Sequence, residues 1–450
     1  MTGIWIWVGM ANDSQRRSFL KGIAGAGTVA IAGCTGSDGL GDGSGDGSDN
    51  EETETSGGSS GDALSIGVLF PYTGEYDWVG SDIFPIVEMV AAEINDTGGI
   101  NGKEINLVKG DTEATVDAAV TATKKLINVD NVQAFIGPTS LTYTGTIDLF
   151  QENGVVTVSP TGSTTELDDI GGKYQFRTVP SDNLGGRAIA KAARSQDYNT
   201  VKAYGRMAVM SGKAPALQAF KRPVTRSFEK FGGTIVENMD FSVGQSSYNA
   251  EISQVLESDP EIITLVGTPE DSEKILRAAF QAGYEGNWFF TQDQTNDDFV
   301  SSVDKQLTEG AFGLKDAVSP DAVEADRIEQ FKQDVKDFTG SEPGFFAENS
   351  YDAMNIIGLA MKRTAVENGE VTRQGIADNI RPVAKPSGET VRNYTNGANL
   401  LKDGTDINYE GLVGPLDFDD NGNVLASFAI LQATEGAWNR VATVPPEELE

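Results

Sequence analysis

From residue 63 onward, short apolar runs alternate with amphipathic segments. Residues 64–70 form a nearly continuous apolar run, which is typical of a strand buried on both faces. The next segment repeats apolar residues at helical spacing until Gly98 and Gly99 end it. These apolar positions are Ile83, Ile86, Val87, Val90, Ala91 and Ile94. The pattern predicts a strand followed by a helix that packs against it.

The same unit recurs along the chain. Strands are predicted at 105–108, 132–136 and 155–159, with helices at 116–128 and 142–153 between them. A second series contains predicted helices at 184–195 and 248–258 and predicted strands at 202–210, 234–237, 262–266 and 288–291. Strands that alternate with helices form parallel sheets covered on both faces. Two such series predict an α/β protein with two Rossmann-like lobes.

The charge of the chain is strongly unbalanced. Acidic residues outnumber basic residues by 67 to 34, which gives a formal net charge of −33. Because the excess is spread along the chain, electrostatics disfavours nucleic acid as a partner. A surface of this charge repels itself unless salt screens it. This favours a halophilic protein over one that binds a basic partner.

Two residue types with versatile chemistry are scarce. The 450 residues include no histidine and a single cysteine, Cys34. Histidine-based triads, imidazole proton shuttles and the usual zinc sites are therefore excluded. The segment 417–422 matches the start of an EF-hand loop, but Phe428 stands where that loop needs a glutamate. We interpret it as a turn between strands. We expect a protein that is not an enzyme and uses no metal or other cofactor.

The N-terminal 34 residues resemble an export signal. Arg16 and Arg17 precede a short Gly/Ala-rich run at 22–33, which ends at Cys34 in the sequence Ile-Ala-Gly-Cys. This resembles a twin-arginine signal joined to a lipobox. The run is shorter than the roughly 20 apolar residues that a membrane helix needs. We expect residues 1–34 to be a lipoprotein signal and Cys34 to carry the lipid. The expected location is the extracellular face of the cell membrane.

Residues 35–62 consist almost entirely of Gly, Ser, Asp, Glu and Thr. Such a composition buries too little apolar surface to order itself. We expect a disordered acidic linker that tethers the folded part to the membrane.

Seven segments in order resemble the branched-chain amino acid type of periplasmic binding protein, which has a type I fold. They are 66–74, 94–102, 135–138, 158–160, 176–182, 351–353 and 414–419. The resemblance covers about residues 64–438 and implies two lobes joined by a three-strand hinge, near Val179, Val318 and Asp417. It divides the chain into a first lobe (63–179 and 318–416) and a second lobe (180–317 and 417–450).

Ligands of parallel α/β sheets lie beyond the carboxyl ends of the strands, near helix N-termini. Two first-lobe loops fit this rule, and their hydroxyl groups suit a carboxylate. These loops supply Thr139, Ser140, Gly162, Ser163 and Thr164. The resemblance implies that Ser140, the Gly162 backbone and Ser163 hold the carboxylate of an amino acid. The alternative is that these hydroxyl groups only cap the following helices.

The second lobe should supply the partner of an ammonium group. The resemblance implies that Asp293, after the predicted strand at 288–291, pairs with it. Thr268 stands near a position that is often aromatic in the family. Tyr76, Trp78 and Val79, in the loop after the first strand, are candidates for the side-chain end of the pocket, although the two aromatic residues could instead pack within their own loop. The basic stretch 213–226 departs from the family, and a solvated helix face is favoured there over a contact with an acidic ligand.

The resemblance implies the solute-binding lipoprotein of an ABC importer, which closes on an amino acid by a hinge motion. Its expected partners are a small-molecule solute, a membrane permease and the lipid anchor, and the expected state is a monomer. The alternatives are a sensory protein of the same fold and a receptor for an amide or urea-like solute.

Overall fold

The computed structural model describes residues 63–74, 76–295, 297–317 and 325–449. Arg16, Arg17, Cys34, the linker 35–62 and the expected hinge position Val318 lie outside these residues. Among the described residues, no helix combines the length and apolar character that a membrane span requires.

The first lobe is built on a sheet that, within the described residues, has five parallel strands in the order β2-β1-β3-β4-β5. Its strands are β1 (Leu64–Phe70), β2 (Ile105–Asp111), β3 (Ala134–Ile136), β4 (Val156–Ser159) and β5 (Gln175–Arg177). The helical segments within this series are α2 (Asp77–Asp96), α3 (Val116–Asn128), α4 (Ser140–Glu152) and the 3-10 turn η1 (Thr165–Leu167).

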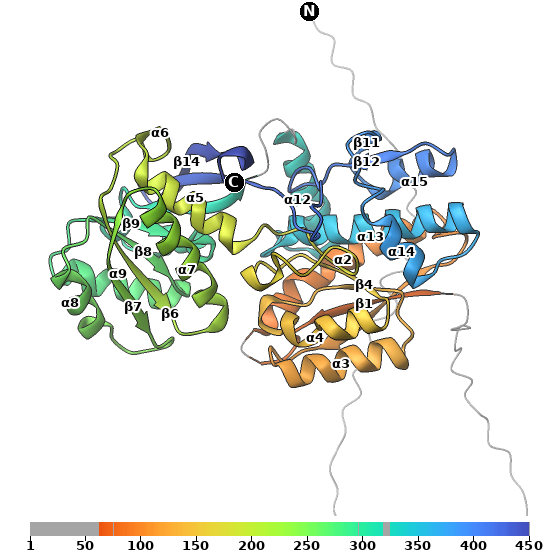
Figure 1. Ribbon diagram of the computed structural model, residues 1–450, viewed down its shortest axis with the longest axis horizontal. Helices are drawn as coiled ribbons and strands as arrows, with labels where there is room; N and C mark the ends of the chain where they lie inside the picture. The colour runs from red at the N-terminus through yellow and green to blue at the C-terminus, as the bar shows by residue number, and fades with distance from the viewer. Residues whose placement is uncertain (1–62, 75, 296, 318–324, 450) are drawn as a thin grey trace, which may run out of the picture. The chain divides into compact units, whose positions relative to one another are not determined.

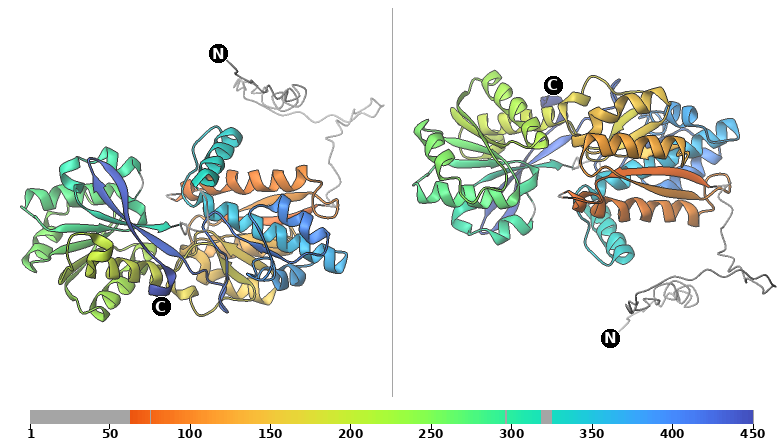
Figure 2. Two further views of the ribbon diagram at one scale, coloured as in Figure 1. Left: turned by 90° about the horizontal axis from the view of Figure 1, so that it is seen from above. Right: turned by 90° about the horizontal axis from the view of Figure 1, so that it is seen from below.

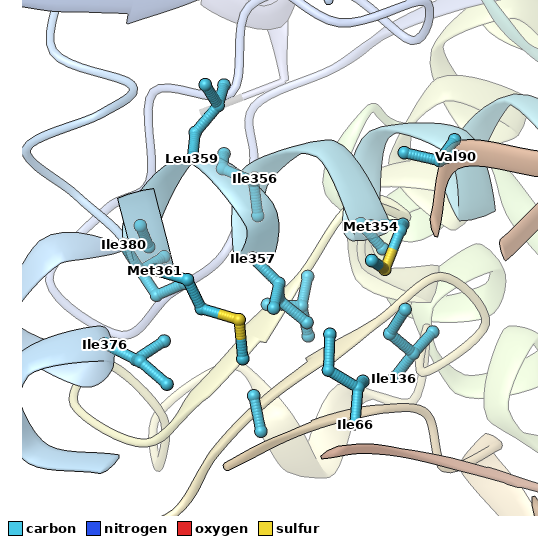
Figure 3. Close-up of a cluster of buried hydrophobic side chains, with 14 of the residues drawn as sticks. Ile66, Val90, Ile136, Met354, Ile356, Ile357, Leu359, Met361, Ile376 and Ile380 are labelled. Atoms are coloured by element: carbon cyan, nitrogen blue, oxygen red, sulfur yellow. The ribbon is translucent and has the colours of Figure 1, made fainter. Parts of the chain in front are cut away.

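Alternating residues of β1 divide the first core into two layers. Ile66, Val68 and Phe70 pack with α2 and with α13 (Ala347–Asn368), whereas Leu69 packs with α3 and α4 on the other face. Figure 1 shows these helices on the two sides of the sheet. Figure 3 shows α13 lying over the strands with Met354, Ile357 and Met361 pointing toward them. Burial on both faces explains why the strand reads as a continuous apolar run.

Besides α13, the elements that follow β10 (Phe312–Ala317) in the sequence, up to Tyr409, belong with the first lobe or connect to it. They are α12 (Ala325–Thr339), α14 (Arg373–Asn379), α15 (Tyr394–Lys402) and the small parallel pair β11 (Glu389–Val391) and β12 (Ile407–Tyr409). The 22-residue α13 ends at Gly369, whose φ of +77° gives the left-handed cap that glycine adopts without strain.

The second lobe is built on a sheet with the order β14-β13-β10-β9-β8-β6-β7. The parallel strands are β6 (Arg206–Gly212), β7 (Thr234–Phe241), β8 (Ile262–Val266), β9 (Asn287–Phe290) and β10 (Phe312–Ala317). Two antiparallel strands, β13 (Ser427–Thr434) and β14 (Ala437–Val444), complete one edge, where Figure 2 shows them as the blue ribbon beside the green strands.

Helices cover both faces of the second sheet. They are α5 (Asp182–Arg194), α6 (Gln196–Asn199), α7 (Pro215–Lys230), α8 (Asn249–Glu257), α9 (Pro269–Gln281), α10 (Asp297–Ser302) and α11 (Lys305–Thr308), with the 3-10 turns η2 (Gln292–Gln294) and η3 (Pro446–Glu448). The predicted α/β class with two parallel-sheet lobes is confirmed.

The chain around Asp417 packs with the first lobe. Phe418 contacts Phe176 edge to face at 5.0 Å, and Val424 is buried in the first core. The chain joins the second sheet only at Ser427, where β13 begins. The segment 417–424, assigned to the second lobe from the sequence, therefore contacts the first. The predicted turn is present here, since Asp419 Oδ1 accepts hydrogen bonds from the amides of Asn421 and Asn423 at 2.8 Å.

Candidate ligand-binding site

Ser140 joins the two hydroxyl-bearing loops of the first lobe. Its Oγ donates to the carbonyl of Thr161 and accepts from the amide of Thr164, both at 3.2 Å. Ser159 adds a second link between the loops, because its Oγ donates to the carbonyl of Pro138 at 2.7 Å. The two loops therefore form one surface at the carboxyl edge of β3 and β4.

Two buried threonines on this surface have unused hydroxyl groups. Thr139 and Thr161 are each 7% exposed, and within the described part of the chain neither Oγ1 has a hydrogen-bond partner. Thr139 is the N-cap residue of α4, yet its side chain makes no capping bond. The capping alternative therefore does not apply to Thr139. Buried hydroxyls beside a helix N-terminus suit an anionic group such as a carboxylate.

Gly162 and Ser163 form the centre of the second loop. A side chain at Gly162 would lie 2.9 Å from both Ser159 Oγ and the ring of Tyr143, so this position requires glycine. Ser163 hydrogen-bonds the carboxyl group of Asp182, and its carbonyl accepts from the Asp182 amide at 2.9 Å. Thr164 caps the short turn η1, as the capping alternative expects.

Three carboxyl groups interact electrostatically here, and one of them, that of Asp182, is hydrogen-bonded to Ser163. They belong to Asp182 at the start of α5, Asp293 in η2 and Asp316 on β10. Burial raises the pKa of Asp182 to about 7, with Ser163 and Arg177 opposing the shift and Asp168 and Asp293 adding to it. Burial likewise raises the pKa of Asp293 to about 6 and that of Asp316 to about 7. Such groups gain from a cationic partner.

The arrangement of these carboxyl groups can be compared with that of metal ligands. Among the described residues, no group of three or more acidic or cysteine side chains is arranged to hold a metal ion. An organic cation such as an ammonium group, which needs fewer and less regular acceptors, is the better match.

Thr268 and Asp293 lie on adjoining loops of the second lobe. Gln294 ties them together, because its Nε2 donates to the carbonyl of Gly267 and, at 3.0 Å, to Ser272 Oγ. Thr268 itself caps α9, with its Oγ1 accepting from the Asp271 amide at 3.2 Å. Its hydroxyl thus has a structural role.

The candidates at the side-chain end fall into two groups. Val79 is buried in the first core, and Tyr76 packs against that core from the position before α2. Trp78 is 42% exposed and contacts Phe345 edge to face at 5.8 Å. The next residue, Phe346, has a φ of +57°, which is uncommon for an aromatic residue. Trp78, Phe345 and Phe346 therefore form an aromatic cluster that lies partly open.

The basic stretch lies largely on α7. Arg222 and Arg226 are exposed, while Val224 and Phe228 on the same helix are buried. Lys221 is bound by Asp240 at 2.7 Å. Arg222 and Arg226 thus lie on a solvated helix face, as predicted, whereas Lys221 is partly covered.

Several residues of this region were not predicted from the sequence. The sequence offered no local reason to assign a role to Asp182, Asp316, Phe345 or Phe346. The first three are separated in sequence from residues with which they interact in the structure. The only available indication was that Asp182 lies within the family-like segment 176–182.

Replacing Asp182 by asparagine should raise the melting temperature of the ligand-free protein at pH 8 and leave it nearly unchanged at pH 4. Burial raises the pKa of this carboxyl from its ordinary 3.8 to about 7. Its contribution to stability is therefore complete below about pH 4 and is lost as the pH rises through 7. Thermal unfolding at fixed salt measures the effect. Equal melting temperatures of variant and wild type at pH 8 would contradict this reasoning.

Two α/β lobes that bring hydroxyl loops and carboxyl groups to the ends of their strands define a class of ligand-binding protein. The periplasmic binding protein family model matches residues 63–437. This chain therefore belongs to the periplasmic binding protein family, whose members bind solutes.

Its relatives include proteins named for amino acid binding. The leucine-, isoleucine-, valine-, threonine- and alanine-binding protein of Pseudomonas aeruginosa is 24% identical over 325 residues, covering 71% of this chain and 82% of the relative. The chemotactic signal transduction system substrate-binding protein BasB of Halobacterium salinarum is 22% identical over 394 residues, covering 84% of this chain and 88% of BasB. The crystal structure of the leucine-binding protein LivK from Thermotoga maritima matches with a TM-score of 0.69 and 22% identity, over 86% of this chain and 100% of LivK.

Proposed function

We propose that this protein is the solute-binding lipoprotein of an ABC importer and that it binds an α-amino acid, with leucine and its neighbours as the first candidates. The observation that carries the proposal is the pairing of two chemistries at one site. Buried hydroxyl groups without partners in the described chain lie beside the N-terminus of α4. Asp182, which is hydrogen-bonded to Ser163, and Asp293, which interacts with Asp182, are carboxyl groups with raised pKa values.

The two ends of an amino acid match these chemistries. The carboxylate is stabilised by hydroxyl groups and the positive end of the α4 dipole. The ammonium group offsets the cost of burying Asp293 and Asp182 in their ionised forms. The aromatic cluster Trp78, Phe345 and Phe346 supplies apolar surface for a branched side chain. The names of the Pseudomonas and Thermotoga relatives support the same class of ligand.

The solute can be identified directly. Protein purified without added amino acids is unfolded, and the released small molecules are identified by mass spectrometry. We expect an aliphatic amino acid, and calorimetry with L-leucine should then give a 1:1 complex. Release of an amide, a urea-like compound or an aromatic acid, with no heat from amino acids, would contradict the proposed ligand class.

A sensory role is the second candidate. The observation that favours it is the similarity to BasB, which is named as a component of chemotactic signal transduction. The ligand site would be the same, but the closed form would contact a membrane signalling protein in place of a permease. Crosslinking in native membranes distinguishes the two, because it recovers either permease subunits or a transducer.

Replacing Cys34 by serine should release the protein from the membrane into the medium. The lipobox resemblance at 31–34 motivates this expectation, since lipid attached to the cysteine thiol supplies about 0.8 kcal/mol of anchoring for each buried CH2 group. Fractionation and intact mass of the wild type and the variant measure it. A wild-type protein without a lipid mass increment, or a variant that stays in the membrane fraction, would refute lipid anchoring.

A further inference from the structure

The guanidinium group of Arg177 lies behind the second hydroxyl loop. Arg177 is 2% exposed and stands at the end of the edge strand β5. Its Nη1 donates to the carbonyls of Gly162 and Thr164, at 3.2 and 3.0 Å. These carbonyls flank Ser163, so one side chain fixes the backbone on both sides of that residue.

The same guanidinium is linked to the first turn of the second lobe. Its Nη2 donates to Asp168 Oδ1 at 2.5 Å, and Ser181 Oγ donates to that oxygen at 2.6 Å. Ser181 in turn caps α5, because its Oγ accepts from the Asn183 amide at 3.0 Å. Arg177, Asp168 and Ser181 therefore connect the ligand loop to the helix that begins with Asp182.

A small, partly open pocket adjoins Arg177. Its volume is about 10 Å³, and its lining includes Gln175, Arg177 and Tyr143. A volume of this size holds one water molecule. Two buried polar atoms of the lining, Arg177 Nε and Gln175 Oε1, have no hydrogen-bond partner within the described residues. One is a donor and the other an acceptor, so a water in contact with both atoms would satisfy both.

We propose that Arg177 is the positioning residue of the ligand loop 161–164, and that one water in this pocket, bound by Arg177 Nε and Gln175 Oε1, completes its hydrogen bonds. This inference rests on the proposed function for its effect on affinity. Arg177 does not touch the ligand. It holds the carbonyls of Gly162 and Thr164, which leaves the Ser163 hydroxyl and the loop amides in place for the carboxylate and for Asp182.

Ligand affinity gives the first test. Arg177→Met should weaken L-leucine binding by about tenfold or more, since hydrogen bonds from a charged donor to two loop carbonyls are lost. Arg177→Lys, which keeps the charge but has no fork of donors, should show a smaller loss. The matched control is Arg373→Met. Arg373 also donates to two first-lobe carbonyls, those of Val132 and Ile127, but it does so before β3. We expect its affinity to stay within about twofold of wild type.

Hydrogen exchange gives a second test that needs no ligand. In Arg177→Met and Arg177→Lys, amides of residues 161–168 and 181–185 should exchange faster, while those of β1 and α13 should keep the wild-type rate. Arg373→Met should not change the 161–168 segment. If wild-type protein binds no amino acid, the proposed ligand class fails and exchange still decides the role of Arg177. Unchanged exchange in 161–168, or uniform acceleration along the whole chain, overturns the positioning role.

The water is tested by a high-resolution crystal structure of the wild-type protein. We expect one ordered water within about 3.2 Å of both Arg177 Nε and Gln175 Oε1. In Gln175→Leu the acceptor is absent, and this water should be lost. A dry wild-type cavity, or direct contact between the two side chains, overturns the water site.

Discussion

Replacing Asp293 by asparagine should weaken L-leucine binding by at least about tenfold, because breaking a buried charge pair typically costs about 2–5 kcal/mol and each 1.4 kcal/mol is a factor of ten. Burial raises the pKa of Asp293 to about 6, so the carboxyl is mostly ionised at pH 8 but poorly solvated. An ammonium group is the partner that offsets this cost. Asparagine preserves the shape of the side chain and removes the charge. Calorimetry at pH 8 and fixed salt measures the change.

Asp259→Asn is the matched control for this variant. Asp259 lies in the same lobe, and its side chain is 96% exposed, so removing its charge should leave affinity almost unchanged. Both variants lose one negative charge by the same substitution, so they differ only in where that charge lies. Equal affinity of Asp293→Asn and wild type would remove Asp293 from the ligand site and would leave Asp182 as the carboxyl to test next.

The strands of the two sheets could be predicted because most are buried on both faces. The predicted strand at 262–266 and the predicted helix at 116–128 agree with β8 and α3 at both ends. β13 and β14 were not predicted as strands. In β14 the exposed Arg440 and Asn439 interrupt any apolar run, and its partner is the antiparallel β13, so a search for buried βα units does not detect it.

The first-lobe loops could be predicted as one candidate surface, because a strand end followed by Ser, Thr and Gly is a local pattern. The roles of individual residues could not. Ser140 lies in the candidate loops but uses its hydroxyl to join them. Thr161, which was not singled out, has a buried hydroxyl without a partner in the described chain.

The roles of the carboxyl groups near Asp293 were even harder to predict from the sequence. Asp182 lies at the start of a helix, Asp293 in a 3-10 turn and Asp316 on a strand. More than a hundred residues separate Asp182 from Asp293 in the sequence. In a chain with 67 acidic residues, no local feature separates these three from the exposed majority. Only the packing that desolvates them raises their pKa values and marks them as a place for a cation.

Dilution from molar salt into dilute buffer should unfold the protein. The formal net charge of −33 is spread over the sequence, and the screening length grows from about 3 Å at 1 M salt to about 30 Å at 0.01 M. Repulsion among acidic side chains that is confined to near neighbours at high salt then acts across the whole molecule. Asp182, Asp293 and Asp316 carry their share of this charge only above about pH 7, because desolvation raises their pKa values to about 7, 6 and 7.

Circular dichroism and tryptophan fluorescence during stepwise dilution measure this transition. We expect loss of native signal between molar and about 0.1 M salt and recovery when salt is restored, because the stabilising term is screening and not a bound ion. Sodium and potassium chloride at equal ionic strength should act alike, whereas a specific ion site would distinguish them. Saturating L-leucine should shift the midpoint to lower salt, since a ligand that binds only the folded state stabilises it. A native spectrum that persists in dilute buffer at pH 8 would show that packing alone outweighs the charge, and it would exclude the halophilic interpretation of the acidic composition.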